Sequence, residues 1–255
     1  MNQVPKALVF DLDGTLAESK QRVEAEIGLL LGELLKQVPV AVMSGAGFPQ
    51  FERQFFPALP LGADLSRLYI FPDNAAQCFV YRTGSWHAQY DNAFSAQERE
   101  HILKVLNEAL EETGLSGAPV RVWGERIEDR GAEIAFSPLG QAAPLKDKRA
   151  WHEAHDDLRH KLHELLNQKL PDFANAMGGL TTIDITRKGI TKAYGVGRLS
   201  ELTGIAIPDM LYVGDALGEG GNDSIVIGTG IPTHQVFGPA ETAALIKDLL
   251  PKLHA

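Results

Sequence analysis

Four short runs of apolar residues constrain the fold of this chain more than any other feature of its sequence. The runs are residues 7–10 (ALVF), 40–43 (VAVM), 68–71 (LYIF) and 210–213 (MLYV). Helical patterns lie between them, such as the apolar positions three and four residues apart in residues 21–36. Because buried strands joined by helices are typical of a parallel sheet that is covered on both faces, the sequence predicts an α/β fold.

The middle of the chain follows a different pattern. Residues 79–90 (FVYRTGSWHAQY) predict two strands around a Thr83–Gly84 turn, and residues 119–137 predict further strands. Residues 95–113 and 145–169 predict helices, the first with a capping box formed by Ser95 and Glu98. We therefore expect an α+β domain of residues 84–182, inserted into a core domain of residues 1–83 and 183–255.

The composition argues against several classes of protein. There is no apolar stretch of about 18 residues, so we expect no membrane span, and the N-terminal residues do not resemble a secretory signal. Cys78 is the only cysteine, which excludes an internal disulfide and favours a cytoplasmic location. The net charge of −9 disfavours nucleic acid as a partner, because binding to its phosphates normally needs a basic patch.

Polar side chains follow the predicted strands, at the edge of the sheet where α/β proteins bind their ligands. Asp11 and Asp13 follow the first strand, Ser44 the second and Asp215 the last. Carboxylates that converge there raise one another's pKa values unless a cation lies between them, and Mg²⁺ prefers such oxygen ligands. An aspartate in this setting can attack phosphorus and form an aspartyl phosphate. Taken alone, the Asp-Leu-Asp-Gly-Thr string also suits an exposed strand end followed by a turn.

Four segments in the same order resemble the motifs of the haloacid dehalogenase superfamily of phosphatases and phosphotransferases. They are VFDLDGTLAES (9–19), VMSG (42–45), KGITKAYGV (188–196) and LYVGDALGEGGND (211–223). The resemblance implies a Rossmann-like parallel core with an inserted cap. It implies that Asp11 is the nucleophile, that Asp13 is the general acid and base, and that Lys192 neutralises the charge of Asp11 and the phosphate. It further implies a phosphate-binding pair, Ser44 and Gly45, and a set of Mg²⁺ ligands: Asp11, Asp13, Asp215, Asn222 and Asp223.

Within this superfamily, the chain most resembles the eukaryotic α-phosphomannomutases with their large α+β cap. The segments that carry this resemblance are GDALGEGGND (214–223), GGLTTIDITRKGITKAY (178–194), DRGAEIAFSPLGQ (129–141) and YIFPDNAAQ (69–77). The resemblance implies a small sugar phosphate as substrate and allows a homodimer, since related mutases often pair through their caps. It implies that the cap binds the sugar and its distal phosphate through Arg130, Arg149, Thr182 and Asp184. Lys148 competes with Arg149 for this role, and Arg130 could instead pair with Glu128 or Asp129.

Two positions depart from the mutase pattern. Lys20 and Gln141 stand where these mutases have arginine. Lysine keeps the charge but loses the planar fork that grips phosphate with two hydrogen bonds, and glutamine loses the charge. A weaker hold on the distal phosphate leaves two reactions open, a mutase reaction and the hydrolysis of a sugar phosphate. A binding module without turnover is disfavoured, because every expected catalytic position carries a suitable residue.

Overall fold

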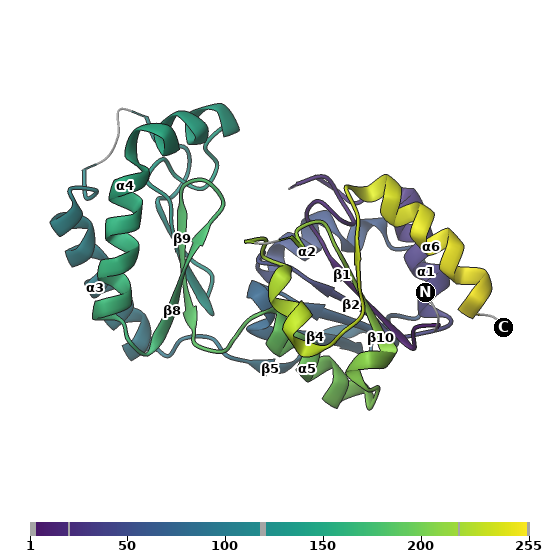
Figure 1. Cartoon of the computed structure of the whole chain (residues 1–255). Helices are drawn as coiled ribbons and strands as arrows, with labels where there is room; N and C mark the ends of the chain where they lie inside the picture. The colour runs from purple at the N-terminus through teal and green to yellow at the C-terminus, as the bar shows by residue number, and fades with distance from the viewer. Residues whose placement is uncertain (1–3, 20, 118–120, 219, 254–255) are drawn as a thin grey trace. The chain divides into compact units, whose positions relative to one another are not determined.

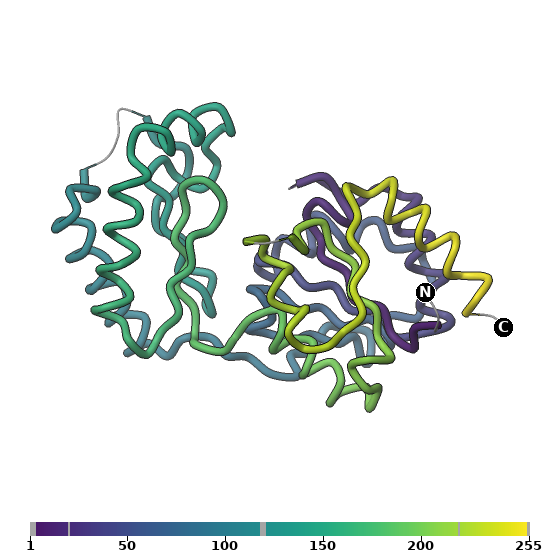
Figure 2. Tube along the Cα trace, in the orientation of Figure 1, coloured from purple at the N-terminus to yellow at the C-terminus, as the bar shows by residue number. Residues whose placement is uncertain are grey.

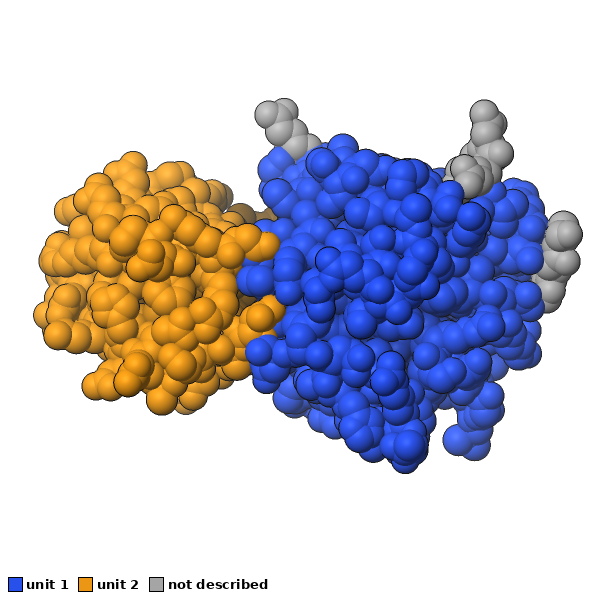
Figure 3. All heavy atoms as spheres, turned by 90° about the horizontal axis from the view of Figure 1, so that it is seen from below, with its two compact units in different colours: residues 1–91, 190–255 blue, residues 92–189 orange. Residues whose placement is uncertain are grey.

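The computed structural model describes residues 4–19, 21–117, 121–218 and 220–253. The chain forms two compact units, residues 1–91 with 190–255, called unit 1, and residues 92–189, called unit 2 (Figure 3). These limits differ from the expected domain limits of 83/84 and 182/183. Strand β5 (Ser85–Asp91) pairs with β4 (Gln77–Arg82) and so belongs to the large sheet of unit 1, while β9 (Thr182–Arg187) pairs along its whole length with strands of unit 2.

Unit 1 contains a seven-stranded sheet in the order β11-β10-β1-β2-β3-β4-β5 (Figure 1). Its first five strands in that order run parallel, and β4 and β5 add an antiparallel hairpin around the predicted Thr83–Gly84 turn. Figure 2 shows how β10, near the C-terminus, lies beside β1, near the N-terminus. The parallel strands are β1 (Ala7–Asp11), β2 (Val40–Met43), β3 (Leu68–Phe71), β10 (Met210–Gly214) and β11 (Thr233–Gln235).

Helices cover both faces of this sheet, which explains why its central strands β10, β1, β2 and β3 are almost entirely apolar. One face packs against α1 (Ala25–Leu35), α2 (Phe48–Gln54) and α6 (Pro239–Leu253) through alternate residues such as Leu8 and Phe10. The other face packs against α5 (Lys192–Thr203) through the intervening residues, such as Val9. The predicted α/β class is therefore confirmed, and burial of these apolar side chains is the main stabilising term.

Unit 2 contains a four-stranded antiparallel sheet in the order β6-β7-β9-β8. The helices α3 (Ala96–Thr113) and α4 (Leu145–Lys169) pack on one face of it, where residues such as Ile134 and Ile183 form a separate core (Figure 1). The capping box of Ser95 and Glu98 that the sequence predicts is present at the start of α3. The remaining strands are β6 (Ile127–Asp129), β7 (Glu133–Phe136) and β8 (Phe173–Gly178).

Short 3₁₀ helices complete the described structure, at Phe56–Ala58, Leu65–Arg67, Asp73–Ala75, Ile207–Asp209 and Ser224–Thr229. Within the described ranges, every helix is too short or too polar to cross a lipid bilayer.

Candidate active site

The parallel register of unit 1 brings the polar strand ends together. Asp11 is the last residue of β1 and pairs in register with Met43, so that Ser44 lies one residue beyond it. Asp215 follows β10 directly on the other side of β1. The expected convergence at one sheet edge therefore occurs.

Lys192 joins two buried carboxylates at this edge. Its ammonium donates to Oδ1 of Asp11 at 2.5 Å and to Oδ1 of Asp223 at 2.6 Å. All three residues are almost fully buried. Lys192 opens helix α5, whose N-cap is Thr191, so its place is fixed by the backbone. A buried lysine between two carboxylates fits the charge-balancing role that the resemblance implies for Lys192.

The negative charge at this edge exceeds the positive charge. Burial raises the pKa of Asp11 to about 7; Lys192 acts against this rise, while Asp223 and Asp215 add to it. The pKa of Asp215 is also raised, by burial and by Asp223. The pKa of Lys192 is raised because the two carboxylates outweigh its burial. One ammonium thus faces three carboxylates, and a further cation would restore the balance.

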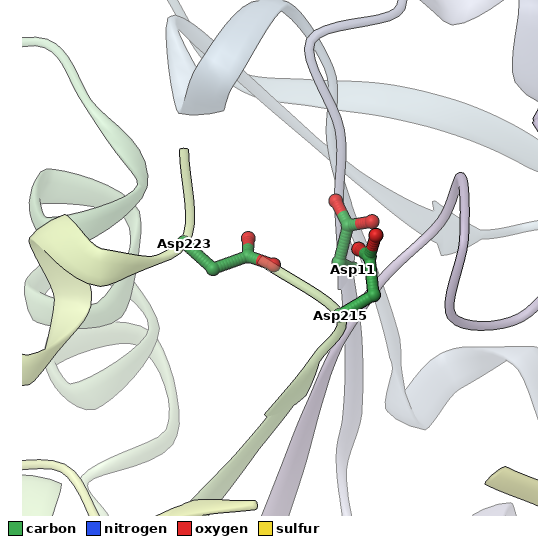
Figure 4. Close-up of side chains that lie close together, drawn as sticks. All are labelled: Asp11, Asp215 and Asp223. Carbon is green, nitrogen blue, oxygen red and sulfur yellow. The ribbon is translucent and has the colours of Figure 1, made fainter. Parts of the chain in front are cut away.

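A metal ion fits the same three carboxylates. Asp11, Asp215 and Asp223 each offer an oxygen, and these oxygens lie within 4.8 Å of one another. Figure 4 shows the three side chains grouped at this sheet edge. Asp223 is also engaged elsewhere, since its Oδ1 accepts a hydrogen bond from Tyr212 at 2.6 Å and its Oδ2 one from the Ala216 backbone at 3.2 Å. The donor set is all oxygen and anionic, which suits a hard cation.

Gly14 makes room for one of these ligands. It has a φ of +87°, and a Cβ at this position would lie 2.5 Å from Oδ2 of Asp215. Thr15, next in the chain, donates from its hydroxyl to Oδ1 of the same aspartate at 3.5 Å. Gly14 and Thr15 therefore both lie against the Asp215 carboxylate.

Asp13 does not belong to the three-carboxylate group through its side chain. Its Oδ1 accepts a hydrogen bond from Gln54 at 2.9 Å, and its Oδ2 one from Gln50 at 3.5 Å. Gln50 and Gln54 lie four residues apart on one face of α2 and also bond to each other. The two amides thus fix the direction of the Asp13 carboxyl group.

Ser44 and Gly45 form a tight turn after β2. The Ser44 hydroxyl is buried and accepts a hydrogen bond from the Ala46 backbone at 3.0 Å. Its backbone N–H donates to Phe71, at the end of the neighbouring strand β3, at 3.1 Å. The hydroxyl is therefore held at the sheet edge beside the end of β1.

The predicted cap residues lie in unit 2. Asp184 and Thr182 alternate with the core residues of β9 and so share the face opposite α3 and α4. Burial raises the pKa of Asp184, while Arg130 and Arg159 lower it. Arg130 forms ion pairs with Glu128, at 2.7 Å, and with Glu133, so the expected alternative of a salt bridge is present for Glu128.

The remaining predicted residues are less closely grouped. Gln141 donates to the Ala135 carbonyl at 3.3 Å, on the strand next to Asp184. Lys148 donates to the Gln141 carbonyl at 3.3 Å, whereas Arg149 is exposed on α4. The structure thus favours Lys148 over Arg149 as the neighbour of Gln141. In unit 1, Asn222 is exposed, and Lys20 lies outside the described residues.

Three residues that the sequence did not single out lie near predicted ones, Tyr212 and Gln54 in unit 1 and Arg159 in unit 2. Tyr212 lies in an apolar run that predicts a core strand, and Gln54 lies outside every motif in the sequence, although both donate hydrogen bonds to carboxylates of unit 1. Arg159 is buried on α4 and donates to the Gly179 carbonyl at 3.2 Å. A buried tyrosine hydroxyl needs a partner, which was a signal for Tyr212, but the sequence did not identify the partner, Asp223, which lies 11 residues further along the chain.

Comparison with known proteins points to one family. A model of the eukaryotic phosphomannomutase family matches residues 28–252. A probable phosphomannomutase of Caenorhabditis elegans is 26% identical over 259 residues, which cover 96% of each chain. The phosphomannomutase of Spinacia oleracea is 27% identical, over 92% of this chain and 91% of its own.

Solved structures share the fold. An IMP-nucleotidase of Plasmodium falciparum superposes with a TM-score of 0.68 and 18% identity, covering 98% of this chain and 72% of that one. A trehalose-6-phosphate phosphatase related protein gives a TM-score of 0.57 and 16% identity, covering 96% and 97%. The match confirms the haloacid dehalogenase fold with its inserted α+β unit.

Proposed function

The chain belongs to the eukaryotic phosphomannomutase family, and on this basis we propose that it interconverts mannose 1-phosphate and mannose 6-phosphate through Asp11. The observation that carries the proposal is the buried ion pair of Lys192 with Asp11 at 2.5 Å, in a group with Asp223 and Asp215. Such an arrangement holds a carboxylate at a strand end and surrounds it with groups that balance a phosphoryl charge.

Asp11 acts as the nucleophile in this proposal. A bond forms between its carboxylate oxygen and phosphorus while the bond from phosphorus to the sugar oxygen breaks. Asp13 gives its proton to the departing oxygen, and the amides of Gln50 and Gln54 keep it oriented for this transfer. The donor in this first half is a hexose bisphosphate, which leaves a hexose monophosphate. In the second half, Asp13 takes the proton from a hydroxyl of a hexose monophosphate. The resulting oxygen attacks the phosphorus on Asp11, the bond from phosphorus to the Asp11 oxygen breaks, and a hexose bisphosphate forms again.

We propose Mg²⁺ as the metal ion, with Asp11, Asp215 and Asp223 as the residues that would hold it. When bound, it offsets the charge of the carboxylates and of the phosphoryl oxygens. Lys192 neutralises Asp11 from the other side, and Ser44 and Gly45 bind the phosphoryl oxygens through hydroxyl and backbone N–H groups.

The substrate's sugar and distal phosphate are assigned to unit 2. Arg130 carries the charge for the phosphate, and Thr182 and Asp184 bind sugar hydroxyls. Lys148 supports this assignment, since its ammonium lies beside Gln141 and supplies a positive charge where the Gln141 side chain is neutral. Lys20 is a further phosphate ligand in this proposal.

A second candidate function is the hydrolysis of a sugar phosphate. It is favoured by Gln141, because a neutral amide holds a phosphate less strongly than a guanidinium does. Both reactions share the transfer to Asp11, so only the fate of the phosphoryl group separates them.

The test is to mix the protein with mannose 1-phosphate, Mg²⁺ and a trace of hexose bisphosphate and to follow both products. We expect mannose 6-phosphate to form. Release of inorganic phosphate without any isomer would show a phosphatase instead. A Gln141→Arg variant is expected to raise the ratio of isomerisation to hydrolysis, and an unchanged ratio removes this residue from the distal phosphate site.

A further inference from the structure

Three consecutive residues after β3 have a left-handed backbone. Asp73, Asn74 and Ala75 have φ values of 49°, 53° and 68°. Residues other than glycine normally adopt this conformation only singly, with asparagine and aspartate the most tolerant. A run of three is strained, and strain of this kind persists only where the surrounding structure holds it.

Backbone hydrogen bonds tie this turn to the segment that follows β2. The Asn74 N–H donates to the Ser44 carbonyl at 2.8 Å, and the Asp73 N–H donates to the Ala46 carbonyl at 3.1 Å. Since the Ser44 hydroxyl accepts from Ala46, both ends of the Ser44–Ala46 turn are fixed. Hydrogen bonds from the strained turn therefore hold the Ser44–Ala46 segment, to which phosphoryl binding is assigned.

The side chain of Asn74 lies against the glycine in that segment. A Cβ at Gly45 would lie 3.4 Å from Nδ2 and 3.6 Å from Oδ1 of Asn74, so the carboxamide borders the space beside the Gly45 Cα. Asn74 is partly buried.

The other side of the turn packs on the helix that carries Lys192. A Cβ at Gly195 of α5 would lie 2.6 Å from the Cβ of Ala75, so only glycine permits this approach. The Tyr90 hydroxyl donates to the Ala75 carbonyl at 2.9 Å and closes the turn from a third direction. The turn thus connects the segment of Ser44 with the helix of Lys192.

We propose that Asn74 is a positioning residue of the phosphoryl site: its backbone holds the Ser44 carbonyl, and its carboxamide fixes the Gly45 peptide in the orientation that receives the phosphoryl group. This proposal rests on the function proposed above. It explains why an asparagine occupies the middle of the strained run, since asparagine adopts the left-handed conformation more easily than most residues and still carries an amide.

Two substitutions separate the backbone from the side chain. Asn74→Gly removes the carboxamide and relaxes the left-handed backbone, whereas Asn74→Ala removes it and increases the strain. Thr83→Gly is the control, because Thr83 has a φ of 50° at the exposed β4–β5 turn and relaxes the same strain away from the site. Activity and the inhibition constant of orthovanadate, a mimic of the phosphoryl group, are measured for the full chain, with thermal stability alongside.

We expect both Asn74 variants to lose roughly 10- to 100-fold in kcat, the range for a misplaced catalytic contact, with little change in KM. The orthovanadate inhibition constant should rise by a similar factor, although Asn74→Gly is at least as thermally stable as the wild type. Thr83→Gly should keep the activity and orthovanadate affinity of the wild type. If Asn74→Gly retains both and only Asn74→Ala loses them, the carboxamide does not position the Gly45 peptide, and the proposal is overturned. A wild type without Asp11-dependent turnover would refute the proposed function, while orthovanadate binding would still test Asn74.

Discussion

Replacement of Gly14 by alanine should weaken metal binding by displacing Asp215. The added Cβ would lie 2.5 Å from Oδ2 of Asp215, whereas ordinary contacts begin at 3.4 Å, so the carboxylate must retreat by about 1 Å. Disturbing the support of a metal ligand typically costs 10- to 100-fold in metal affinity. We therefore expect the Mg²⁺ concentration for half-maximal activity to rise by about 10-fold or more.

Gly62→Ala is the matched control for this experiment. Gly62 has a φ of +86°, nearly that of Gly14, but a Cβ there meets no atom within 4 Å. Both variants carry the same left-handed alanine penalty of about 1–2 kcal/mol, and only Gly14→Ala disturbs Asp215. The assay is a Mg²⁺ titration of activity, together with the Mg²⁺-induced rise in melting temperature, which reports binding to the folded state. Equal Mg²⁺ dependence in the two variants would refute the assignment of Asp215 as a metal ligand.

Three further outcomes are expected. Tyr212→Phe should lower the free energy of unfolding by about 1.5–3 kcal/mol, because Asp223 loses a charged hydrogen bond. Tyr90→Phe is the control, and it should lose about 0.5–1.5 kcal/mol because its hydrogen bond is to a neutral carbonyl. Equal losses in urea unfolding would count against a charged hydrogen bond at Asp223. Hydrogen bonds from Arg187 and Ser95 lower the pKa of Glu98 from 4.5 to about 2, so its stabilisation is present above pH 4.5 and lost as the pH falls toward 2. Glu98→Gln should remove about 1 kcal/mol of that pH-dependent stability, after allowance for solvent screening. An unchanged loss of stability at acid pH in this variant would argue against the Glu98–Arg187 ion pair as its cause. Asp11→Asn should abolish both isomerisation and hydrolysis, since an amide is not a nucleophile; retained turnover would exclude Asp11.

The sequence predicted those parts of the site that follow from the topology of a parallel sheet. Asp11 and Asp215 meet because they lie at the ends of neighbouring parallel strands. Lys192 reaches Asp11 from the start of α5, the helix that precedes β10. Apolar runs without alternation identified the covered sheet, and the capping box at Ser95 identified the start of α3.

Other features depend on packing that periodicity does not encode. Whether Lys148 or Arg149 faces Gln141 depends on how helix α4 is rotated about its axis. A shift of one residue along the helix would exchange the directions of the two side chains. The left-handed run around Asn74 contains no glycine, so no local signal distinguishes it from an ordinary turn. The hairpin strand β5 resembles the inserted unit in its composition, but it pairs with the large sheet.

The central claim is that Asp11 receives the phosphoryl group. Its most direct test is to incubate the protein with hexose bisphosphate and Mg²⁺, quench with borohydride and examine the peptide that contains Asp11 by mass spectrometry. Borohydride reduces an aspartyl phosphate to homoserine. We predict homoserine at position 11 in the wild type, absent when bisphosphate is omitted and in Asp11→Asn. An unmodified Asp11 under turnover, or a modification at another carboxylate, would contradict the claim.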